Sequence, residues 1–141
     1  MYLWHYDIDG QYLLYSAGGR TENYLRGVQP AGADGDVTFT TILLACCPGR
    51  WPHIHFEVYP SIDAATAGAR PLATSQLALP EDACKTLYAS DGYQRSVASL
   101  ANVSMATDSV FRDGATWETS AATGGVTDGY VVSLTVAVRT S

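Results

Sequence analysis

The chain has 141 residues, of which 47% are apolar and 16% charged, and its formal net charge is −6. This length suits one domain with a modest core, which we expect to span residues 1–141. Lysine and arginine total only 8 and are scattered, which disfavours nucleic acid as a partner. No apolar run is long enough to cross a bilayer, so we expect no membrane span and a soluble protein, cytoplasmic or secreted after loss of an unseen signal.

Strand patterns dominate the first third of the chain. Residues 2–6 form a candidate strand that ends in an Asp-Gly turn, and 11–15 would be its return strand. Residues 24–29 form another candidate. Residues 37–43 are β-branched and alternating, which also predicts a strand.

One helix is predicted between later strands. Strands are expected at 53–59 and 72–79, separated by a loop of small residues at 61–70. Residues 80–90 begin with proline and two acidic residues, a composition typical of a helix N-terminus. The sequence therefore predicts one short helix there.

The C-terminal third shows little periodicity. We expect a long irregular loop over 91–128, of the kind that is usually functional, and a final strand over 130–138. Short strands with frequent turns predict a mainly β protein, specifically an antiparallel β-sandwich.

Three cysteines, Cys46, Cys47 and Cys84, do not make a disulfide framework. Cys46 and Cys84 could pair in an oxidising compartment, but free buried thiols are the simpler interpretation.

Two histidines, His53 and His55, lie one residue apart in a predicted strand. Side chains alternate along a strand, so both imidazoles share one face while Ile54, Phe56 and Val58 take the other. Imidazoles that converge from a rigid strand suit a metal ion, although the same pattern also occurs on ordinary strands.

Five blocks of sequence, taken in order, carry a family resemblance. They are Trp4-His5-Tyr6-Asp7-x-Asp9-Gly10-Gln11-Tyr12, Tyr24-Leu25-Arg26-Gly27-Val28-Gln29, Val37-Thr38-Phe39-Thr40-Thr41-Ile42, Pro48-Gly49-Arg50-x-Pro52-His53-Ile54-His55-Phe56 and Thr74-Ser75-Gln76-Leu77. The chain resembles the intradiol ring-cleavage dioxygenases, the family of catechol and protocatechuate dioxygenases. The similarity runs from about residue 3 to residue 94 and resumes weakly in the last strand.

The resemblance implies a ferric site with two tyrosinates and two histidines in an antiparallel β-sandwich. At matching positions the metal ligands would be Tyr12, His53 and His55. Phenolate oxygen suits the hard Fe(III) ion. The implied partners are a catecholic small molecule and O2, and the implied reaction opens the ring between its two hydroxyl-bearing carbons.

The chain departs from the family pattern in two places. Cys47 occupies the position of the second ligand tyrosine, where a thiolate could bind metal but would tend to reduce Fe(III). The family's strands before Trp4 are also missing, which would leave a sheet edge exposed. A truncated fragment or a homodimer that covers this edge would each explain the second departure.

The sequence also predicts roles for several other polar residues in or near these blocks. The resemblance places Arg50 beside the substrate ring, where a cation stabilises developing negative charge, and Gln76 near the site. Glu57 shares the histidine face but lies further along the strand, so we expect it to be exposed. His5 is expected to make a structural hydrogen bond, and Asp7 and Asp9 are expected to cap the turn.

Two other functions remain open at this stage. Cys47 and the missing strands would fit a non-catalytic β-sandwich that acts as a binding module. A zinc site built from Cys47, His53, His55 and one further ligand would also be chemically ordinary.

Overall fold

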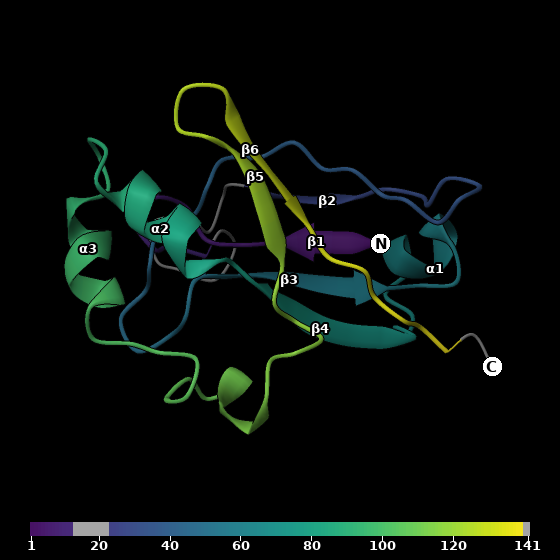
Figure 1. The fold of residues 1–141 in the computed structure, drawn as a ribbon. Coiled ribbons are helices and arrows are strands. Elements are labelled where there is room, and N and C mark those ends of the chain that lie inside the picture. Colours follow the sequence, from purple (N-terminus) through teal and green to yellow (C-terminus); the bar gives the residue numbers. More distant parts are fainter. Residues whose placement is uncertain (13–22, 140–141) are drawn as a thin grey trace.

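The computed structural model describes residues 1–12 and 23–139 (Figure 1). The strands are β1 (Tyr2–Trp4), β2 (Arg26–Val28), β3 (His53–Val58), β4 (Ala73–Ala78), β5 (Ala121–Gly125) and β6 (Gly129–Ser133). The helices are α1 (Ile62–Thr66), α2 (Glu81–Tyr88), α3 (Gln94–Leu100) and the 3-10 helix η1 (Phe111–Asp113). Within the described residues, every helix is too short or too polar to cross a membrane.

The strands form two antiparallel sheets. Four of them pair in the order β2-β1-β3-β4, and β5 pairs with β6 in a separate hairpin. In Figure 1 this hairpin crosses the direction of the four-stranded sheet steeply. A single parallel bridge between Ala78 and Thr119 links the end of β4 to the segment that leads into β5. The prediction of a β-rich, antiparallel architecture is thus confirmed at this level, with a larger helical contribution than expected.

The register of the four-stranded sheet determines which side chains share a face. His55 pairs with Trp4 on one side and with Gln76 on the other. Directly paired residues of antiparallel strands lie on the same face, so these three side chains form one row. Ile54 pairs with Leu77 on the opposite face.

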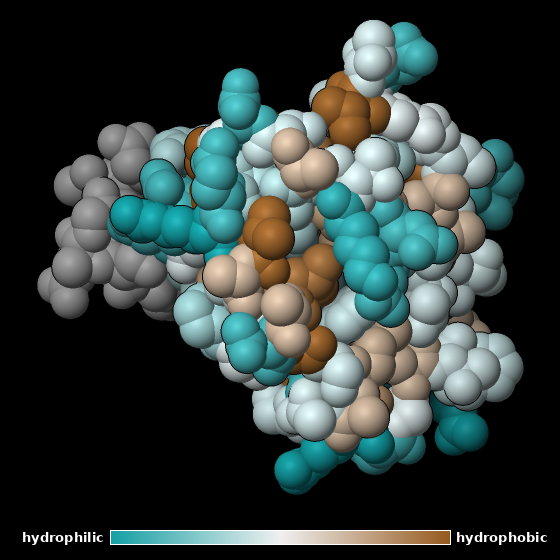
Figure 2. All heavy atoms as spheres, turned by 60° about the vertical axis from the view of Figure 1, so that its left-hand side comes forward, coloured by the Kyte–Doolittle hydropathy of each residue, from teal (hydrophilic) through white to brown (hydrophobic). Residues whose placement is uncertain are grey.

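The apolar face of the sheet packs against α2 and the segment before β3. The main core cluster consists of Tyr6, Leu44, Ala45, Cys46, Ile54, Leu79, Cys84, Leu87 and Tyr88. A second, smaller cluster of Trp51, Ala78 and Phe111 holds η1 against the end of β4. On the side of the molecule that bears α2 and α3, apolar atoms reach the surface between polar ones (Figure 2).

The helix predicted at 80–90 is confirmed as α2. Pro80 precedes its first turn with an extended backbone, and Glu81 and Asp82 lie at the positive end of the helix dipole. Lys85 pairs with Glu81 one turn earlier at 2.6 Å.

The prediction of a strand at 37–43 is wrong, because these residues pair with no strand of the described chain. Side chains instead bind the carbonyl groups where this segment meets the core. The Tyr93 hydroxyl donates to the Leu43 carbonyl at 2.6 Å, and the Tyr88 hydroxyl donates to the Leu44 carbonyl at 3.2 Å. Of this segment only Leu43 packs against the main core cluster, and most of the other residues are exposed.

The expected irregular loop at 91–128 is also wrong, because the segment contains α3, η1 and β5. The loop at 61–70 contains α1, whose N-terminus is capped by Ser61 through a 3.1 Å hydrogen bond from Ala64. Of the other predicted strands, 130–138 begins one residue earlier and ends at Ser133. Most of the predicted strand at 11–15 lies outside the described residues.

Candidate metal centre

Tyr12 follows a tight turn at the end of the first strand segment. The Asp7 carboxylate accepts hydrogen bonds from the backbone amides of Asp9 and Gln11, both at 2.9 Å, so the predicted capping role is confirmed for Asp7. Asp9 contributes its backbone amide to this turn. Gly10 adopts a φ of 78°, a conformation that favours glycine. This turn directs the Tyr12 side chain back over the histidine face of β3.

The three predicted donor atoms converge. Tyr12 Oη lies 2.7 Å from His55 Nε2 and 3.4 Å from His53 Nε2, and the two nitrogens are 3.1 Å apart. Three donors that share one ion at about 2.0–2.2 Å lie about 2.8–3.6 Å from one another. The triangle of donors therefore has nearly the size that a single bound ion requires.

Hydrogen bonds alone satisfy this trio incompletely. His53 Nδ1 lies 2.6 Å from the Trp51 carbonyl oxygen and must donate to it, which leaves Nε2 of the neutral ring without a proton. Only the Tyr12 hydroxyl and, in one of its tautomers, His55 Nε2 carry a proton. At most two protons are therefore available for the three contacts among these atoms. A cation at the centre would satisfy all three lone pairs, and a ligand histidine held by a carbonyl is the usual arrangement at metal sites.

Aromatic neighbours fix the orientation of the donors. The Trp4 ring stacks on His55 at 4.8 Å with an interplanar angle of 8°. Tyr6, which is fully buried, packs edge-on against both Tyr12 and His53. The donors are thus held in place before any ligand arrives.

Burial sets the protonation of the three donors. Burial, together with the nearby Arg50 guanidinium, lowers the pKa of both His53 and His55 to about 4, although the hydrogen bond to Trp51 opposes this for His53. Both imidazoles are neutral at pH 7, the form that binds metal. Burial raises the pKa of Tyr12 to about 12, so the phenol keeps its proton until a cation replaces it.

A pocket opens beside these donors. It has a volume of about 320 Å³ and is lined by Trp4, Tyr12, Arg50 and His55. The pocket offers a ligand one aromatic wall, one guanidinium and direct access to two of the three donors.

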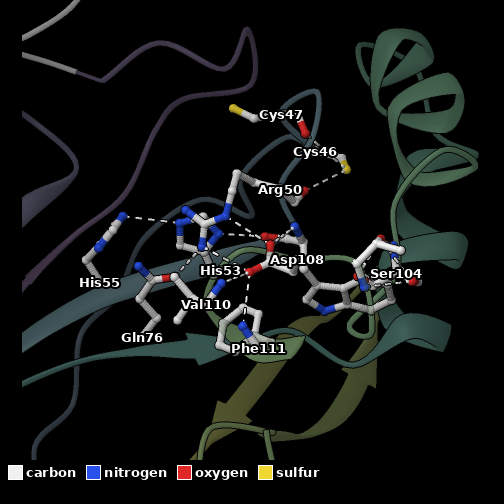
Figure 3. A network of polar contacts seen from close by, with 12 residues as sticks. Cys46, Cys47, Arg50, His53, His55, Gln76, Ser104, Asp108, Val110 and Phe111 are labelled. Carbon is white, nitrogen blue, oxygen red and sulfur yellow. Dashed lines mark hydrogen bonds and ion pairs between the residues drawn. The ribbon is translucent and has the colours of Figure 1, made fainter. Parts of the chain in front are cut away.

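Of the two predicted catalytic residues, Arg50 lines this pocket and Gln76 lies against Arg50 (Figure 3). The Arg50 Nη2 group donates to Gln76 Oε1 at 2.7 Å, and its Nε donates to Asp108 Oδ2 at 2.9 Å. The guanidinium is therefore held by two partners from different parts of the chain.

Cys47 does not join the histidines. Its thiol donates to the Gly10 carbonyl at 3.6 Å, and in Figure 3 its side chain lies apart from both imidazoles. Within the described ranges, no group of three or more His, Cys, Asp or Glu side chains could hold a metal ion. Burial also raises the pKa of the Cys47 thiol, which disfavours the thiolate that a metal needs.

Two other expectations have clear outcomes. His5 is buried and makes the predicted structural hydrogen bonds, to the Tyr6 carbonyl at 2.7 Å and to the Thr41 hydroxyl at 2.8 Å. The expectation that Glu57 is exposed is wrong. It is half-buried because Tyr59 folds back and donates to its carboxylate at 2.7 Å.

Sequence reasoning missed Asp108 and the role of Trp4. Asp108 lies in a segment without periodicity, and no local motif marks it as a partner of Arg50, 58 residues away. Trp4 belongs to the first of the five sequence blocks, but its pairing with His55 depends on the register of the strands. All three cysteines are free, as the simpler interpretation expected.

Comparisons with known proteins give this chain no relative: no family model, curated protein or solved structure matches it.

Proposed function

We propose that this chain is an intradiol dioxygenase-like protein that binds Fe(III) and uses O2 to open a catecholic ring between its two hydroxyl-bearing carbons. The observation that carries the proposal is the convergence of Tyr12, His53 and His55, whose donor atoms lie 2.7–3.4 Å apart. One phenol, which binds as a hard phenolate oxygen, and two neutral imidazoles form a mixed oxygen and nitrogen donor set, which suits ferric iron.

The donor set would bind the ion with release of one proton. Tyr12 has a raised pKa of about 12 because it is buried, so a cation must displace the phenol proton. His53 and His55 are already neutral and lose none. Bound Fe(III) would supply the Lewis acidity and redox capacity that allow a catecholate to react with O2.

The pocket suits a flat anionic ring. Trp4 and the imidazole of His55 bound it on one side, and Arg50 places a positive charge at its edge. A catechol that binds as its dianion would gain from this charge, and so would the ring carbon on which negative charge develops. Both atoms of O2 would enter the product, a muconate-type diacid.

The proposal includes the family's β-sandwich, with the β5–β6 hairpin as part of the second layer. Val132 of β6 packs against the main core cluster, which also contains Ile54 of β3. Apolar contact between the two sheets is what a sandwich requires.

Cys47 should slow the proposed reaction. With a thiol turned toward Gly10 in place of the family's second tyrosine, the site would hold iron less tightly and lack one base for the catechol protons. We therefore expect slow turnover.

The test is reconstitution of the purified protein with Fe(III), followed by metal analysis, a visible spectrum and incubation with catechol in air. We expect one iron per chain, a red to burgundy colour from tyrosinate-to-iron charge transfer, and a ring-opened diacid. Tyr12→Phe should lose the colour. Tyr24→Phe is the matched control, because Tyr24 is 52% exposed and outside the site.

Three outcomes would overturn the proposal. A colourless protein that retains zinc in preference to iron would favour the zinc site, and a protein without stoichiometric metal would favour a binding module. A coloured protein in which Tyr12→Phe and wild type have the same spectrum would show that Tyr12 is not a ligand.

A further inference from the structure

Asp108 is the most heavily hydrogen-bonded side chain around the pocket, although it does not line it. It is only 1% exposed. Its carboxylate accepts from Arg50 Nε at 2.9 Å and from Arg50 Nη2 at 3.4 Å. It also accepts from the backbone amides of Trp51, Val110 and Phe111 at 2.7, 2.8 and 3.2 Å.

These contacts determine which edge of Arg50 faces the pocket. Asp108 engages the Nε and Nη2 edge of the guanidinium, and Gln76 accepts from Nη2 as well. Among the described residues, Nη1 has no hydrogen-bonding partner. A planar guanidinium held along one edge points its remaining nitrogen in a fixed direction, here at the pocket that Arg50 lines.

The same carboxylate also supports the histidine pair. The Trp51 amide donates to Asp108, and the Trp51 carbonyl accepts from His53 Nδ1. One buried anion therefore holds both the pocket cation and the backbone of Trp51, the residue whose carbonyl fixes the His53 tautomer.

We propose that Asp108 is the positioning residue of this site, which holds Arg50 with Nη1 directed at the bound ligand. The negative charge of Asp108 also offsets the positive charge of the Arg50 guanidinium. Without this offset, the guanidinium would repel a metal ion in the neighbouring donor set. The segment between α3 and β5 thus takes part in ligand binding through a residue that never touches the ligand. The inference rests on the proposed function for the identity of the ligand, but not for the Arg50 contact itself.

The first test needs no metal. In ¹⁵N NMR spectra of the metal-free protein, we expect an arginine Nε–H that exchanges slowly with solvent and that is assigned to Arg50 because Arg50→Gln removes it. Asp108→Asn should lose this protection, and Asp113→Asn, an exposed aspartate of the same segment, should keep it. If wild type shows no protected Nε–H that Arg50→Gln removes, the proposal is wrong, and this result holds even if Asp108→Asn fails to fold.

The second test measures catechol binding to the Fe(III)-loaded protein by absorbance titration. Loss of a charged hydrogen bond that orders Arg50 should raise the Kd of Asp108→Asn about tenfold, while Asp113→Asn binds like wild type. In an Arg50→Gln background, Asp108→Asn should add almost nothing, because both changes remove the same interaction.

The outcomes separate the two proposals. A purely structural Asp108 would lower thermal stability but leave the catechol Kd unchanged, or raise it equally in both backgrounds, and either result overturns the inference. Wild type could fail to bind iron and still show a protected Arg50 Nε–H that depends on Asp108. This result would overturn the proposed function and leave the positioning role supported.

Discussion

Two groups of buried and half-buried side chains illustrate how position decides chemistry in this protein. The donor group consists of Tyr12, His53 and His55, and the thiol group consists of Cys46, Cys47 and Cys84. Both groups are largely removed from water and both could ligate a metal by residue type alone. Only the donor group converges on one point beside an open pocket.

Burial has opposite consequences for the two groups. It favours the neutral form of any side chain. For histidine the neutral form is the ligand, so a pKa of about 4 leaves His53 and His55 ready to bind. For cysteine the neutral form is not the ligand, and burial raises the pKa of Cys46 and Cys84 to about 12. The thiols therefore belong to the core, where Cys46 and Cys84 are found.

The largest expected effect is the loss of a donor from the first group. His53→Ala or His55→Ala should lower Fe(III) affinity by more than roughly 100-fold. Loss of a residue that only supports a ligand lowers metal affinity by up to about 100-fold, and loss of the ligand itself should cost more. Iron analysis after dialysis measures this. Glu57→Gln is the matched control, because Glu57 lies on the same strand and face but outside the donor triangle. Equal iron content in all variants would contradict the assignment.

A smaller effect is expected when one of the three cysteines is replaced by a potential metal ligand. Cys47→Tyr introduces the tyrosine that the resemblance to the intradiol dioxygenases would place at this position. If the proposed function is right, it should increase both iron retention and catechol turnover several-fold, since a second phenolate favours the ferric state. Iron retained after dialysis and the initial rate of catechol loss are the measurements. If neither rises, the residue at position 47 does not limit the site.

The donor histidines should also make the metal-free protein sensitive to acid. Their folded-state pKa of about 4 lies below the ordinary value of 6.5, so the unfolded chain binds more protons between these two pH values. The free energy of unfolding should be highest above pH 6.5 and fall as the pH drops toward 4, by at most about 1.4 kcal/mol per pH unit for each histidine. Urea unfolding over this pH range checks this, and His55→Gln should reduce the slope.

The smallest effect is expected for Cys47→Ser. Because the thiol is turned toward Gly10 and away from the histidines, the hydroxyl replacement should leave iron content and the visible spectrum unchanged. A changed spectrum would show that the sulfur does bind the metal, and the contrast between the two groups would no longer hold.

Local patterns predicted those parts of the protein that depend on neighbouring residues. The shared face of His53 and His55 follows from strand alternation, and α2 follows from Pro80 and the acidic residues after it. The position of Tyr12 was implied by a resemblance, since no spacing rule relates it to residues about 40 positions later.

The parts that sequence reasoning missed depend on distant contacts. Asp108 gains its role only because η1 docks against Trp51 and Ala78 in the second core cluster. The segment at 37–43 has a strand-like sequence, but tyrosine hydroxyls from α2 and the start of α3 reach the backbone carbonyls of Leu43 and Leu44. A pattern of alternation alone does not distinguish a largely exposed segment beside the core from a strand that pairs in a sheet.

The most direct test of the donor group is a crystal structure of the Fe(III)-loaded protein with anomalous diffraction measured at the iron absorption edge. We predict one anomalous peak about 2.0–2.2 Å from Tyr12 Oη, His53 Nε2 and His55 Nε2. Iron located elsewhere, or a Tyr12 phenol turned away from an iron bound by the histidines alone, would contradict the account.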